Sequence, residues 1–446
     1  MKRRIIFGTV SAALMVVLAM GVHLYVTSAH AADKDAAYPS LELFTTVLEK
    51  VRHEYVDGKK LTYQELVYGA LKGMINTLDP HSEFMEPEKY NELQSDTEGK
   101  FGGLGIMIEM KDNFVTVLAP MEDTPGAKAG ILAGDRIIKI DGKSAEKLGL
   151  QEAVDQLRGD PGTDVSISIL RPSTGKEIDY TLTRAEIKVD MVKDINNKKE
   201  FPLGEDKIGY VRLVQFGEQT SADLETAIHK LKDQGMQGFI LDLRGNPGGL
   251  LDQAVEVCSK FLPRRQLVVS TEGQNPSTDS KTFYADGHGD ELNGMPMVVL
   301  VNFNSASASE IVSGCLQDLH RGLVMGQKTF GKGSVQSIIP LNDGSALRLT
   351  TAKYYTPSHK VIHGQGITPD CIVPVPDEEA MAIEMKWRRP SLENLSESDR
   401  AQIKDVEDEQ LTRAEDELKG VLIFTKRSPA NQNVASKTDK VMSANQ

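Results

Sequence analysis

The strongest constraint on the fold lies in residues 205–375, where short apolar runs alternate with helical patterns. The apolar runs include "MQGFILDL", "QLVVST" and "MPMVVLV". Between them, "SADLETAIHKLKDQG", "LLDQAVEVCSKFL" and "SEIVSGCLQDLHRG" carry apolar residues at helical spacing. Short buried strands separated by amphipathic helices are typical of a sheet that is covered by helices. The sequence therefore predicts an α/β domain over this part of the chain.

Three loop segments follow predicted strands of this domain. They are "LDLRGNPGGLL" (241–251), "NSASASEIVSG" (304–314) and "TFGKGSVQ" (329–336). The loops at the ends of the strands are where sheets of this kind collect their functional sites. We therefore expect these three segments to contribute to one site.

The serine-rich segment has two interpretations. Ser307 and Glu310 have the spacing of a capping box, which only starts a helix. In the other interpretation one of the four serines, Ser305, Ser307, Ser309 or Ser313, is a nucleophile. Such a serine needs a nearby base to remove its proton. The local pattern alone does not choose among the four.

The histidines of the chain offer no clear base for this nucleophile. None of the nine lies in a triad-like local signature, and no His-Glu-x-x-His motif is present. His320 closes the helical pattern after the serines, which suits a residue at a helix C-terminus. Lys332, between Gly331 and Gly333, could act as a base if burial lowered its pKa. The alternative is a solvated lysine in a hairpin turn.

Residues 1–32 have the features of a targeting segment. The basic stretch "MKRR" is followed by the uncharged run "IIFGTVSAALMVVLAMGV" and by an Ala29-x-Ala31 pattern that a signal peptidase could cut. The apolar run is also long enough for an uncleaved single-span anchor. Both alternatives place the rest of the chain outside the cytoplasmic membrane, since the basic residues precede the apolar run.

Residues 95–185 predict a small domain rich in β-structure. The glycine-rich turn "GKFGGLGIMIEM" leads into a strand, and "DVSISILRP" and "EIDYTLTRA" alternate as strands do. Asp141-Gly142 is a hairpin signal. The helical pattern "LGLQEAVDQLRGDPGT" stops at Gly159 and Pro161.

This region resembles a PDZ domain through "GGLGI" at 102–106 and "AGILAGDRIIKIDG" at 129–142. In that family, backbone N–H groups of the first stretch bind a chain-terminal carboxylate, and glycines let several such groups turn toward one anion. The resemblance assigns this role to Gly102, Gly103, Leu104, Gly105 and Ile106. The strand 105–110 would pair with the peptide, and the helix 149–158 would form the other groove wall. The alternative is a glycine-rich turn without a ligand.

Helical segments flank these two domains. Residues 38–94 repeat an amphipathic helical pattern, and residues 376–446 are charged. Within the latter, 405–424 predict an amphipathic helix that either self-associates or packs on its own domain. The polar residues after it are expected to be disordered.

Charge and cysteine content exclude some classes of function. The net charge of −13 argues against a nucleic-acid partner. Cys258 and Cys315 lie in apolar helical patterns and are expected to be buried. Together with Cys371 they form no metal-binding motif. One disulfide stays open as an alternative, without a predicted pair.

Six motifs together resemble the carboxyl-terminal processing peptidases, also called tail-specific proteases. In the family's order they are "LDPHSEF" (78–84), "DLRGNPGG", "SASASE", "QDLHRG", "TFGKGSVQ" and "GQGITPD" (364–370). The resemblance covers about residues 40–375. It implies an α/β multidomain chain: a crotonase/ClpP-like peptidase core over 186–375, an inserted PDZ domain over 95–185, and helical N- and C-terminal segments. His359 stands where the family would have glycine, outside the catalytic motifs.

The resemblance also assigns roles to individual residues. The nucleophile corresponds to Ser307, the general base to Lys332, and the glutamine that supports the lysine to Gln336. The family's oxyanion hole corresponds to the backbone N–H groups of Gly248 and Ala308. A glycine permits close approach to a substrate carbonyl, and the first residue of a helix has an unpaired N–H.

The implied function is that of a serine endopeptidase with a Ser–Lys dyad and without a metal or cofactor. Its expected substrates are extracytoplasmic proteins with apolar C-termini, in the periplasm or at the membrane. Arg158 matches an arginine that couples the PDZ domain to the active site in the family. A homo-oligomer is expected, while an adaptor protein and membrane association through the N-terminus are open alternatives.

Two other functions fit parts of the sequence. A PDZ scaffold with an inactive peptidase fold is disfavoured by the joint presence of Ser307, Lys332 and Gln336. An acyl-transfer enzyme of the crotonase type is disfavoured by the PDZ-like segment and by the lack of a signal for binding the adenine of coenzyme A.

Overall fold

The computed structural model describes residues 37–57, 60–287, 289–388 and 406–426. The targeting segment predicted at 1–32 and the polar end after residue 426 lie outside these residues. The chain forms two compact units, residues 1–84 and 85–446. Within the described residues, no helix is both long and apolar enough to cross a membrane.

The described residues of the first unit contain two helices. Helix α2 (Ala37–Glu54) buries none of its residues, although it carries apolar side chains. Helix α3 (Tyr63–Ile75) packs Tyr68 against Phe84, with ring centroids 5.0 Å apart. The short strand β1 (Glu83–Met85) spans the boundary between the units. The helical N-terminal region predicted from the sequence is therefore present.

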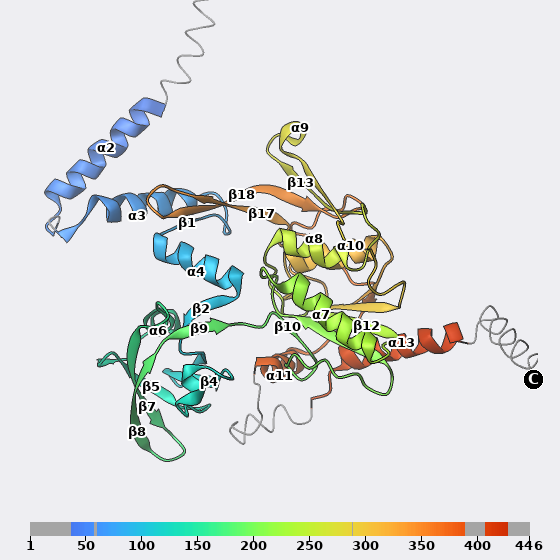
Figure 1. The fold of residues 1–446 in the computed structure, drawn as a ribbon. Coiled ribbons are helices and arrows are strands. Elements are labelled where there is room, and N and C mark those ends of the chain that lie inside the picture. Colours follow the sequence, from blue (N-terminus) through green and yellow to red (C-terminus); the bar gives the residue numbers. More distant parts are fainter. Residues whose placement is uncertain (1–36, 58–59, 288, 389–405, 427–446) are drawn as a thin grey trace, which may run out of the picture. The chain divides into compact units, whose positions relative to one another are not determined.

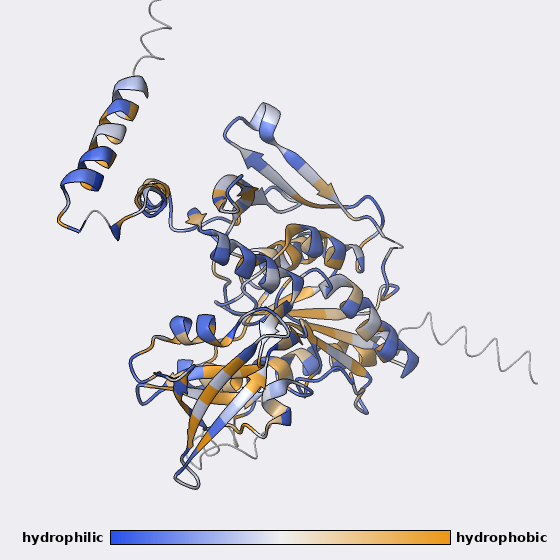
Figure 2. Ribbon diagram, turned by 60° about the vertical axis from the view of Figure 1, so that its left-hand side comes forward, coloured by the Kyte–Doolittle hydropathy of each residue, from blue (hydrophilic) through white to orange (hydrophobic). Residues whose placement is uncertain are grey.

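A six-stranded, mainly parallel sheet organises the larger unit (Figure 1). Its strands, in spatial order, are β10 (Val192–Lys193), β11 (Ile208–Leu213), β12 (Gly238–Asp242), β15 (Met297–Val301), β16 (Leu323–Gly326) and β19 (Cys371–Ile372). Only β10 runs antiparallel to its neighbour among these strands. Every residue of β12 and β15 is buried, and Figure 2 shows the sheet as largely apolar. This is the pattern of parallel strands covered on both faces, and it confirms the predicted α/β domain.

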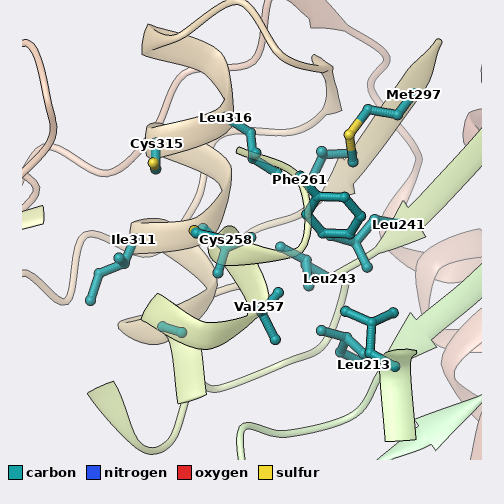
Figure 3. Close-up of a cluster of buried hydrophobic side chains, with 14 of the residues drawn as sticks. Leu213, Leu241, Leu243, Val257, Cys258, Phe261, Met297, Ile311, Cys315 and Leu316 are labelled. Atoms are coloured by element: carbon teal, nitrogen blue, oxygen red, sulfur yellow. The ribbon is translucent and has the colours of Figure 1, made fainter. Parts of the chain in front are cut away.

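Helices α7 (Thr220–Asp233), α8 (Leu251–Ser259) and α10 (Ala308–Asp318) cover one face of this sheet. Their apolar side chains share one buried cluster with Leu241 and Val299 of the central strands, part of which is drawn in Figure 3. Cysteines of α8 and α10 belong to the same cluster. The predicted burial of these cysteines is confirmed.

The opposite face is covered by helix α13 (Glu409–Lys426). Successive residues of a strand point to opposite faces of a sheet, so Ile240 and Leu300 point away from α7, α8 and α10. They form a second cluster with Ala414 and Leu418 of α13, both of which are buried. The predicted apolar face of this helix therefore packs on its own sheet.

A second, antiparallel sheet carries part of the candidate site. In spatial order its strands include β17 (Ser334–Pro340), β18 (Ala346–Tyr355), β13 (Leu267–Gly273) and β14 (Lys281–Tyr284). Helix α9 (Pro276–Asp279) lies between β13 and β14. The register of β17 shifts between Val335 and Gln336. Such a bulge changes the direction in which a side chain points.

Residues 100–188 form a smaller antiparallel domain with its own apolar core. Its strands, in spatial order, are β3 (Ile106–Lys111), β4 (Phe114–Pro120), β5 (Arg136–Ile140), β7 (Asp164–Arg171) and β8 (Lys176–Thr183), with β6 (Lys143–Ser144) beside β5. Helices α5 (Pro125–Lys128) and α6 (Leu150–Leu157) complete it. Where the chain enters and leaves this domain, β2 (Lys100–Gly103) pairs with β9 (Ala185–Lys188).

Two further helices connect these parts. Helix α4 (Pro87–Glu98) runs past the boundary predicted at residue 94 and ends at Gly99, whose φ is +70°. A left-handed residue after the last turn is the usual stop of a helix. Helix α11 (Asp377–Arg388) follows β19.

Candidate active site

The turn between β15 and α10 distinguishes the four serines from one another. The hydroxyl of Ser305 donates to Leu243 O at 2.8 Å, that of Ser309 to Asn246 O at 3.0 Å, and that of Ser313 to Ser309 O at 2.8 Å. These three serines are buried. Ser307 is partly exposed, and its hydroxyl has no hydrogen bond to any part of the chain that the structure describes.

The backbone of Ser307 is strained. Its φ of +54° and ψ of −112° lie in a region that non-glycine residues rarely adopt. Strain of this kind persists only where the surroundings fix it, and it gathers at functional sites. The capping box is only half formed: Ser307 N–H donates to Glu310 Oε2 at 2.8 Å, while Glu310 N–H donates to the backbone oxygen of Ser307. The hydroxyl of Ser307 is thus not used as a cap.

Glu310 joins the serine turn to the lysine loop. One carboxylate oxygen accepts from Thr329 Oγ1 at 2.6 Å and from Gly331 N–H at 2.7 Å. The other carboxylate oxygen, Oε2, accepts from the N–H groups of Ser307 and Lys332, both at 2.8 Å. One oxygen thus holds the backbone nitrogens of these two residues close together. Burial raises the pKa of Glu310, and the four donors oppose this shift. Backbone N–H groups can only donate, so the ionised carboxylate is the form that fits this cage.

Lys332 is half-buried and lies in a loop that only glycines permit. Gly331 has a φ of +93°, and a Cβ on Gly333 would come within 2.1 Å of His363 N. Burial, and next the charge of Arg348, lower the pKa of Lys332. Nothing in the described residues shows a hydrogen bond from Lys332 Nζ to Ser307 Oγ. Glu310 brings the backbones of the two residues together, and no hydrogen bond joins their side chains among the described residues.

Gln336 lies on β17 with a defined amide orientation. Its Nε2 donates to Thr350 Oγ1 at 2.8 Å and to Ser334 Oγ at 3.2 Å. Its Oε1 is buried, and no donor for it is found among the described residues. Buried acceptors normally have a donor, so this oxygen offers a place for an N–H group.

Gly248 lies against the serine turn. A Cβ on Gly248 would come within 2.7 Å of Ser307 Cβ and within 3.0 Å of Ala308 N, and the φ of Gly248 is +103°. The N–H of Ala308 has no acceptor in the described part of the chain. The N–H of Gly248 donates to Asn246 Oδ1 at 2.9 Å. Of the two predicted oxyanion donors, one is therefore unpartnered and the other is engaged.

Asn246, which the sequence did not single out, links this loop to the serine turn. It is fully buried, and its Nδ2 donates to Leu213 O at 2.9 Å. Its backbone oxygen accepts from Ala306 N–H and from Ser309 Oγ, both at 3.0 Å. No sequence signal could have separated this role from that of an ordinary turn residue, because asparagine is common in turns.

In the smaller domain, the predicted carboxylate-binding loop connects β2 to β3. Gly102 and Gly103 end β2, Leu104 and Gly105 form the turn, and Ile106 begins β3. The turn N–H groups, those of Leu104 and Gly105, have no acceptor among the described residues. Two adjacent unpartnered N–H groups are suited to bind an anion.

Packing holds this turn in shape. Gly105 has a φ of +67°, and a Cβ there would come within 2.3 Å of Thr124. The hydroxyl of Thr124 donates to Gly105 O at 3.1 Å. Strand β3 is an edge strand of its sheet, and α6 packs beside it. The sequence predicts that these two elements form the walls of the peptide groove, which stays a prediction.

Arg158 follows α6 and contacts α4. It donates to Glu92 Oε1 at 3.0 Å and to Asp96 Oδ1 at 3.3 Å, and its guanidinium lies 4.6 Å from the centroid of the Phe101 ring. None of the described catalytic candidates is among its partners.

His359 occupies a position suited to glycine. Its φ is +61°, and its ring stacks on Tyr355 with centroids 4.6 Å apart. The left-handed region explains why glycine is expected here, and histidine is among the residues that tolerate it. The departure from the family pattern is therefore accommodated locally.

Among the described residues, one group could approach a single metal ion. It consists of Glu225, His229 and Glu291. Lys260 already pairs with Glu225, and Lys232 with Glu291. Glu225 and His229 are on α7 and Glu291 precedes β15, and none of the three is a candidate catalytic residue.

Comparisons with known proteins show what the chain is similar to. The model of peptidase family S41 matches residues 207–373, and a PDZ domain model matches residues 116–171. A carboxy-terminal-processing protease of Bartonella bacilliformis is 44% identical over 387 residues, which are 85% of this chain and 85% of that protein. A carboxyl-terminal-processing protease of Synechocystis is 38% identical, covering 73% of this chain and 75% of that protein.

Among solved structures, the photosystem II D1 C-terminal processing protease is 33% identical. The match covers 70% of this chain and 84% of that chain, with a TM-score of 0.43. The family assignment therefore depends on the sequence relatives, whose identity and coverage are high. The chain belongs to the carboxy-terminal processing proteases of peptidase family S41 and carries a PDZ domain.

Proposed function

We propose that this peptidase cleaves extracytoplasmic proteins near their C-termini with Ser307 as nucleophile and Lys332 as general base. One observation carries the proposal. Ser307 is the serine of its cluster whose hydroxyl is unengaged among the described residues, and it lies beside the unpartnered N–H of Ala308. The buried carboxylate of Glu310 connects this turn to the lysine loop.

Substrate capture begins at the PDZ loop. The C-terminal carboxylate of a substrate accepts from the N–H groups of Leu104 and Gly105, while its last residues extend β3 by backbone pairing. An apolar C-terminal side chain suits a position between β3 and α6, because Ile106 and Ile108 of β3 and Leu157 of α6 belong to or pack against that domain's apolar core. The polypeptide beyond the PDZ domain then reaches Ser307 in extended form.

Acylation follows. Neutral Lys332 takes the proton of Ser307 as Oγ attacks the scissile carbonyl carbon, and the carbonyl oxygen becomes an oxyanion. Ala308 N–H stabilises this charge directly. Gly248 N–H joins it once the oxyanion replaces Asn246 Oδ1 as its acceptor. The Lys332 ammonium then protonates the leaving amine, and the C–N bond breaks.

Deacylation repeats these proton transfers with water. Lys332 removes a proton from water, whose oxygen attacks the acyl carbon, and the proton returns to Ser307 as its ester bond breaks. Gln336 supports the lysine in both steps. Its buried Oε1, which lacks a donor among the described residues, is suited to accept from Lys332 Nζ.

The test uses Ser307→Ala, Lys332→Ala and the control Lys328→Ala, in which an exposed lysine of the same segment is removed. An unfolded protein with an apolar C-terminus is the substrate. We expect both dyad variants to lose more than about 10³-fold in kcat, as nucleophile or base loss does in related chemistry, and the control to keep wild-type activity. Wild-type activity in either dyad variant would contradict the assignment.

We further propose that Arg158 couples PDZ occupancy to the core through α4. The backbone oxygen of Thr97, at the end of α4, accepts from Glu218 N–H of the core at 3.0 Å. Replacing Arg158 by glutamine is expected to weaken the dependence of cleavage on a free substrate C-terminus. Equal discrimination between free and amidated C-termini in wild type and variant would argue against this role.

The location and assembly of the protein complete the proposal. The apolar segment before residue 32 directs the chain across or into the cytoplasmic membrane, and mass spectrometry of the mature N-terminus tests whether it is cleaved. A homo-oligomer is supported by α2, which exposes Leu41, Phe44 and Val47 and buries none of its residues. Light scattering of the full chain and of Phe44→Glu tests this. Proteins that co-purify with Ser307→Ala would identify trapped substrates and any adaptor.

A further inference from the structure

The loop that carries Gly248 is tied to the C-terminal segment by a buried arginine. Arg244 is 2% exposed. Its Nη1 and Nη2 donate to the two carboxylate oxygens of Asp408 at 2.7 and 2.8 Å, and Nη1 also donates to Gln410 Oε1 at 3.2 Å. Such a bidentate pair fixes both position and orientation of the guanidinium. Arg244 belongs to the loop after β12, while Asp408 directly precedes α13.

A second carboxylate, that of Asp242, also accepts hydrogen bonds from Arg244. Asp242 accepts from Arg244 Nε at 3.0 Å and from Nη2 at 2.7 Å, and it also accepts from Tyr210 OH at 2.7 Å. Burial opposes the charge of Arg244, but the carboxylates of Asp242 and Asp408 outweigh it, so its pKa lies well above the ordinary value. Arg244 is therefore a permanent cation held from two sides.

The C-terminal region also covers the next residue of the loop. The Arg244 guanidinium lies 5.0 Å from the centroid of the Trp387 ring. Gly245 has a φ of +71°, and a Cβ on it would come within 3.6 Å of Trp387 Cζ3. Residues on α11 and before α13 thus enclose the start of the loop.

The rest of the loop leads directly to the serine turn. Gly245 N–H donates to Asn302 Oδ1 at 2.9 Å. Asn246 then accepts from Ala306 N–H with its backbone and from Gly248 N–H with its side chain. Arg244 is therefore joined to Gly248 by a short loop in which the backbones of Gly245, Asn246 and Gly248 each have a hydrogen bond.

We propose that Asp408 is a positioning residue for the oxyanion hole. It fixes Arg244, and through Arg244 it fixes the backbone that presents Gly248 to the substrate carbonyl. This role rests on the proposed serine peptidase function. It makes Asp408 a functional part of the active site, although this residue lies far from the catalytic motifs in the sequence.

The test compares Asp408→Asn with Glu409→Gln in the full chain. Glu409 is the exposed neighbour of Asp408, so the pair is matched in position and in charge lost. We expect Asp408→Asn to lower kcat about tenfold, less than the loss from removing an oxyanion donor outright, with KM changed less than about twofold. Its rate of Ser307 acylation by an activated ester should fall in parallel. Glu409→Gln should leave both rates unchanged.

Thermal melting of each variant gives its folded fraction at the assay temperature, so rates are expressed per folded molecule. A wild-type kcat per folded molecule in Asp408→Asn would overturn the proposal, as would a loss fully explained by unfolding. Asp408→Glu keeps the charge but shifts the carboxylate by one methylene, and we expect an intermediate kcat. If Asp408→Asn does not fold, a wild-type kcat in Asp408→Glu overturns the proposal.

The Ser307→Ala variant separates the two levels of inference. Activity retained in Ser307→Ala would contradict the proposed function itself. An inactive Ser307→Ala together with a fully active Asp408→Asn would contradict only the positioning role.

Discussion

The serine turn and the PDZ loop each contain a residue with positive φ, Ser307 and Gly105, but they use their N–H groups in opposite ways. In the serine turn, Ser305 N–H donates to Asn302 O, Ala306 N–H to Asn246 O, and Ser307 N–H to Glu310. Among the described residues, the N–H of Ala308 alone within 305–308 lacks an acceptor. The serine turn is thus held almost entirely by hydrogen bonds within the protein.

The PDZ loop is held by its carbonyl groups instead. Leu104 O accepts from Gly126 N–H, and Gly105 O accepts from Met121 N–H and from the Thr124 hydroxyl. Its N–H groups at 104 and 105 have no acceptor in the part of the chain that the structure describes.

The difference fits the role that is proposed for each loop. A loop that stabilises a charge for the duration of a reaction works best when its donors are fixed beforehand by the protein. A loop that binds an anionic ligand keeps several donors for that ligand, which then completes its hydrogen bonding. Substitutions that disturb either arrangement should therefore have different consequences.

The largest effect is expected for Gly248→Ala, which should disturb the serine turn and leave the PDZ loop unchanged. The new Cβ would meet Ser307 and Ala308 in a backbone conformation that alanine disfavours. We expect kcat to fall about 10²–10³-fold, as for the loss of an oxyanion donor, with binding of a C-terminal peptide to the PDZ domain unchanged. Gly204→Ala, at an open position, is the control. A kcat equal to wild type would contradict the assignment of Gly248.

A somewhat smaller loss is expected for Glu310→Gln. Both carboxylate oxygens accept backbone N–H donors, so the amide NH₂ faces a donor in either orientation. We expect kcat to fall about 10²-fold, within the range that a displaced general base accounts for. The charge of Glu310 also raises the pKa of Lys332. The variant loses this charge, so the pKa of Lys332 should fall and the acidic limb of the pH profile should move to lower pH.

The control for this variant is Glu98→Gln, at an exposed glutamate of α4. A reduced kcat with an unmoved acidic limb would show that Glu310 supports the fold without acting on Lys332.

The pH dependence tests the base directly. Lys332 must be neutral to accept a proton, and burial together with Arg348 lowers its pKa. We therefore expect kcat/KM to fall about tenfold for each pH unit below the lowered pKa of Lys332. Above that pKa the rate should reach a plateau, and it should do so at a pH lower than the ordinary lysine pKa of about 10.4. Arg348→Met removes a like charge, so it should raise the pKa of Lys332 and move the limb to higher pH.

Lys353→Met, at an exposed lysine of the same strand, should leave the limb in place. A flat rate from about pH 5 to 9 would exclude a lysine base.

The smallest effect on catalysis is expected for Gly105→Ala, on the PDZ side. The Cβ would overlap Thr124 and turn the two N–H groups away from a carboxylate. We expect binding of a peptide with a free C-terminus to weaken about tenfold, or about 1.4 kcal/mol, while cleavage of a C-terminally amidated peptide stays at the wild-type rate. Fluorescence titration measures the first and peptide hydrolysis the second. Equal affinity for free and amidated peptides in the wild type would remove the role of this loop.

The sequence predicted the elements well because their signals are local. The apolar runs became β12 and β15, and the glycine-rich turn 102–106 became the link between β2 and β3. The choice of Ser307 among four serines needed either a family resemblance or the hydrogen bonds of its neighbours. In the structure the other three hydroxyls are engaged.

The sequence could not predict the contacts that depend on folding. Glu310 was considered only as a cap for its own helix, yet it also binds a loop 21 residues away, at Gly331. Asn246 engages Gly248 N–H, which changes the resting state of the predicted oxyanion hole. Arg244 and Asp408 are 164 residues apart, and no local pattern connects them. These pairs form only when the complete fold brings the loops together, so the three-dimensional structure was needed to identify them.

The paired strands β2 and β9 have a further consequence. The chain enters the PDZ domain at Gly103 and leaves it at Ala185, and these two residues are directly opposite each other in the ladder. A domain whose two ends meet side by side can be exchanged as a cassette, because a short turn from one strand to the other restores the chain path. The PDZ domain can therefore be replaced in evolution without rebuilding the peptidase core, so that, if it selects substrates as proposed, specificity can change while the catalytic residues stay the same.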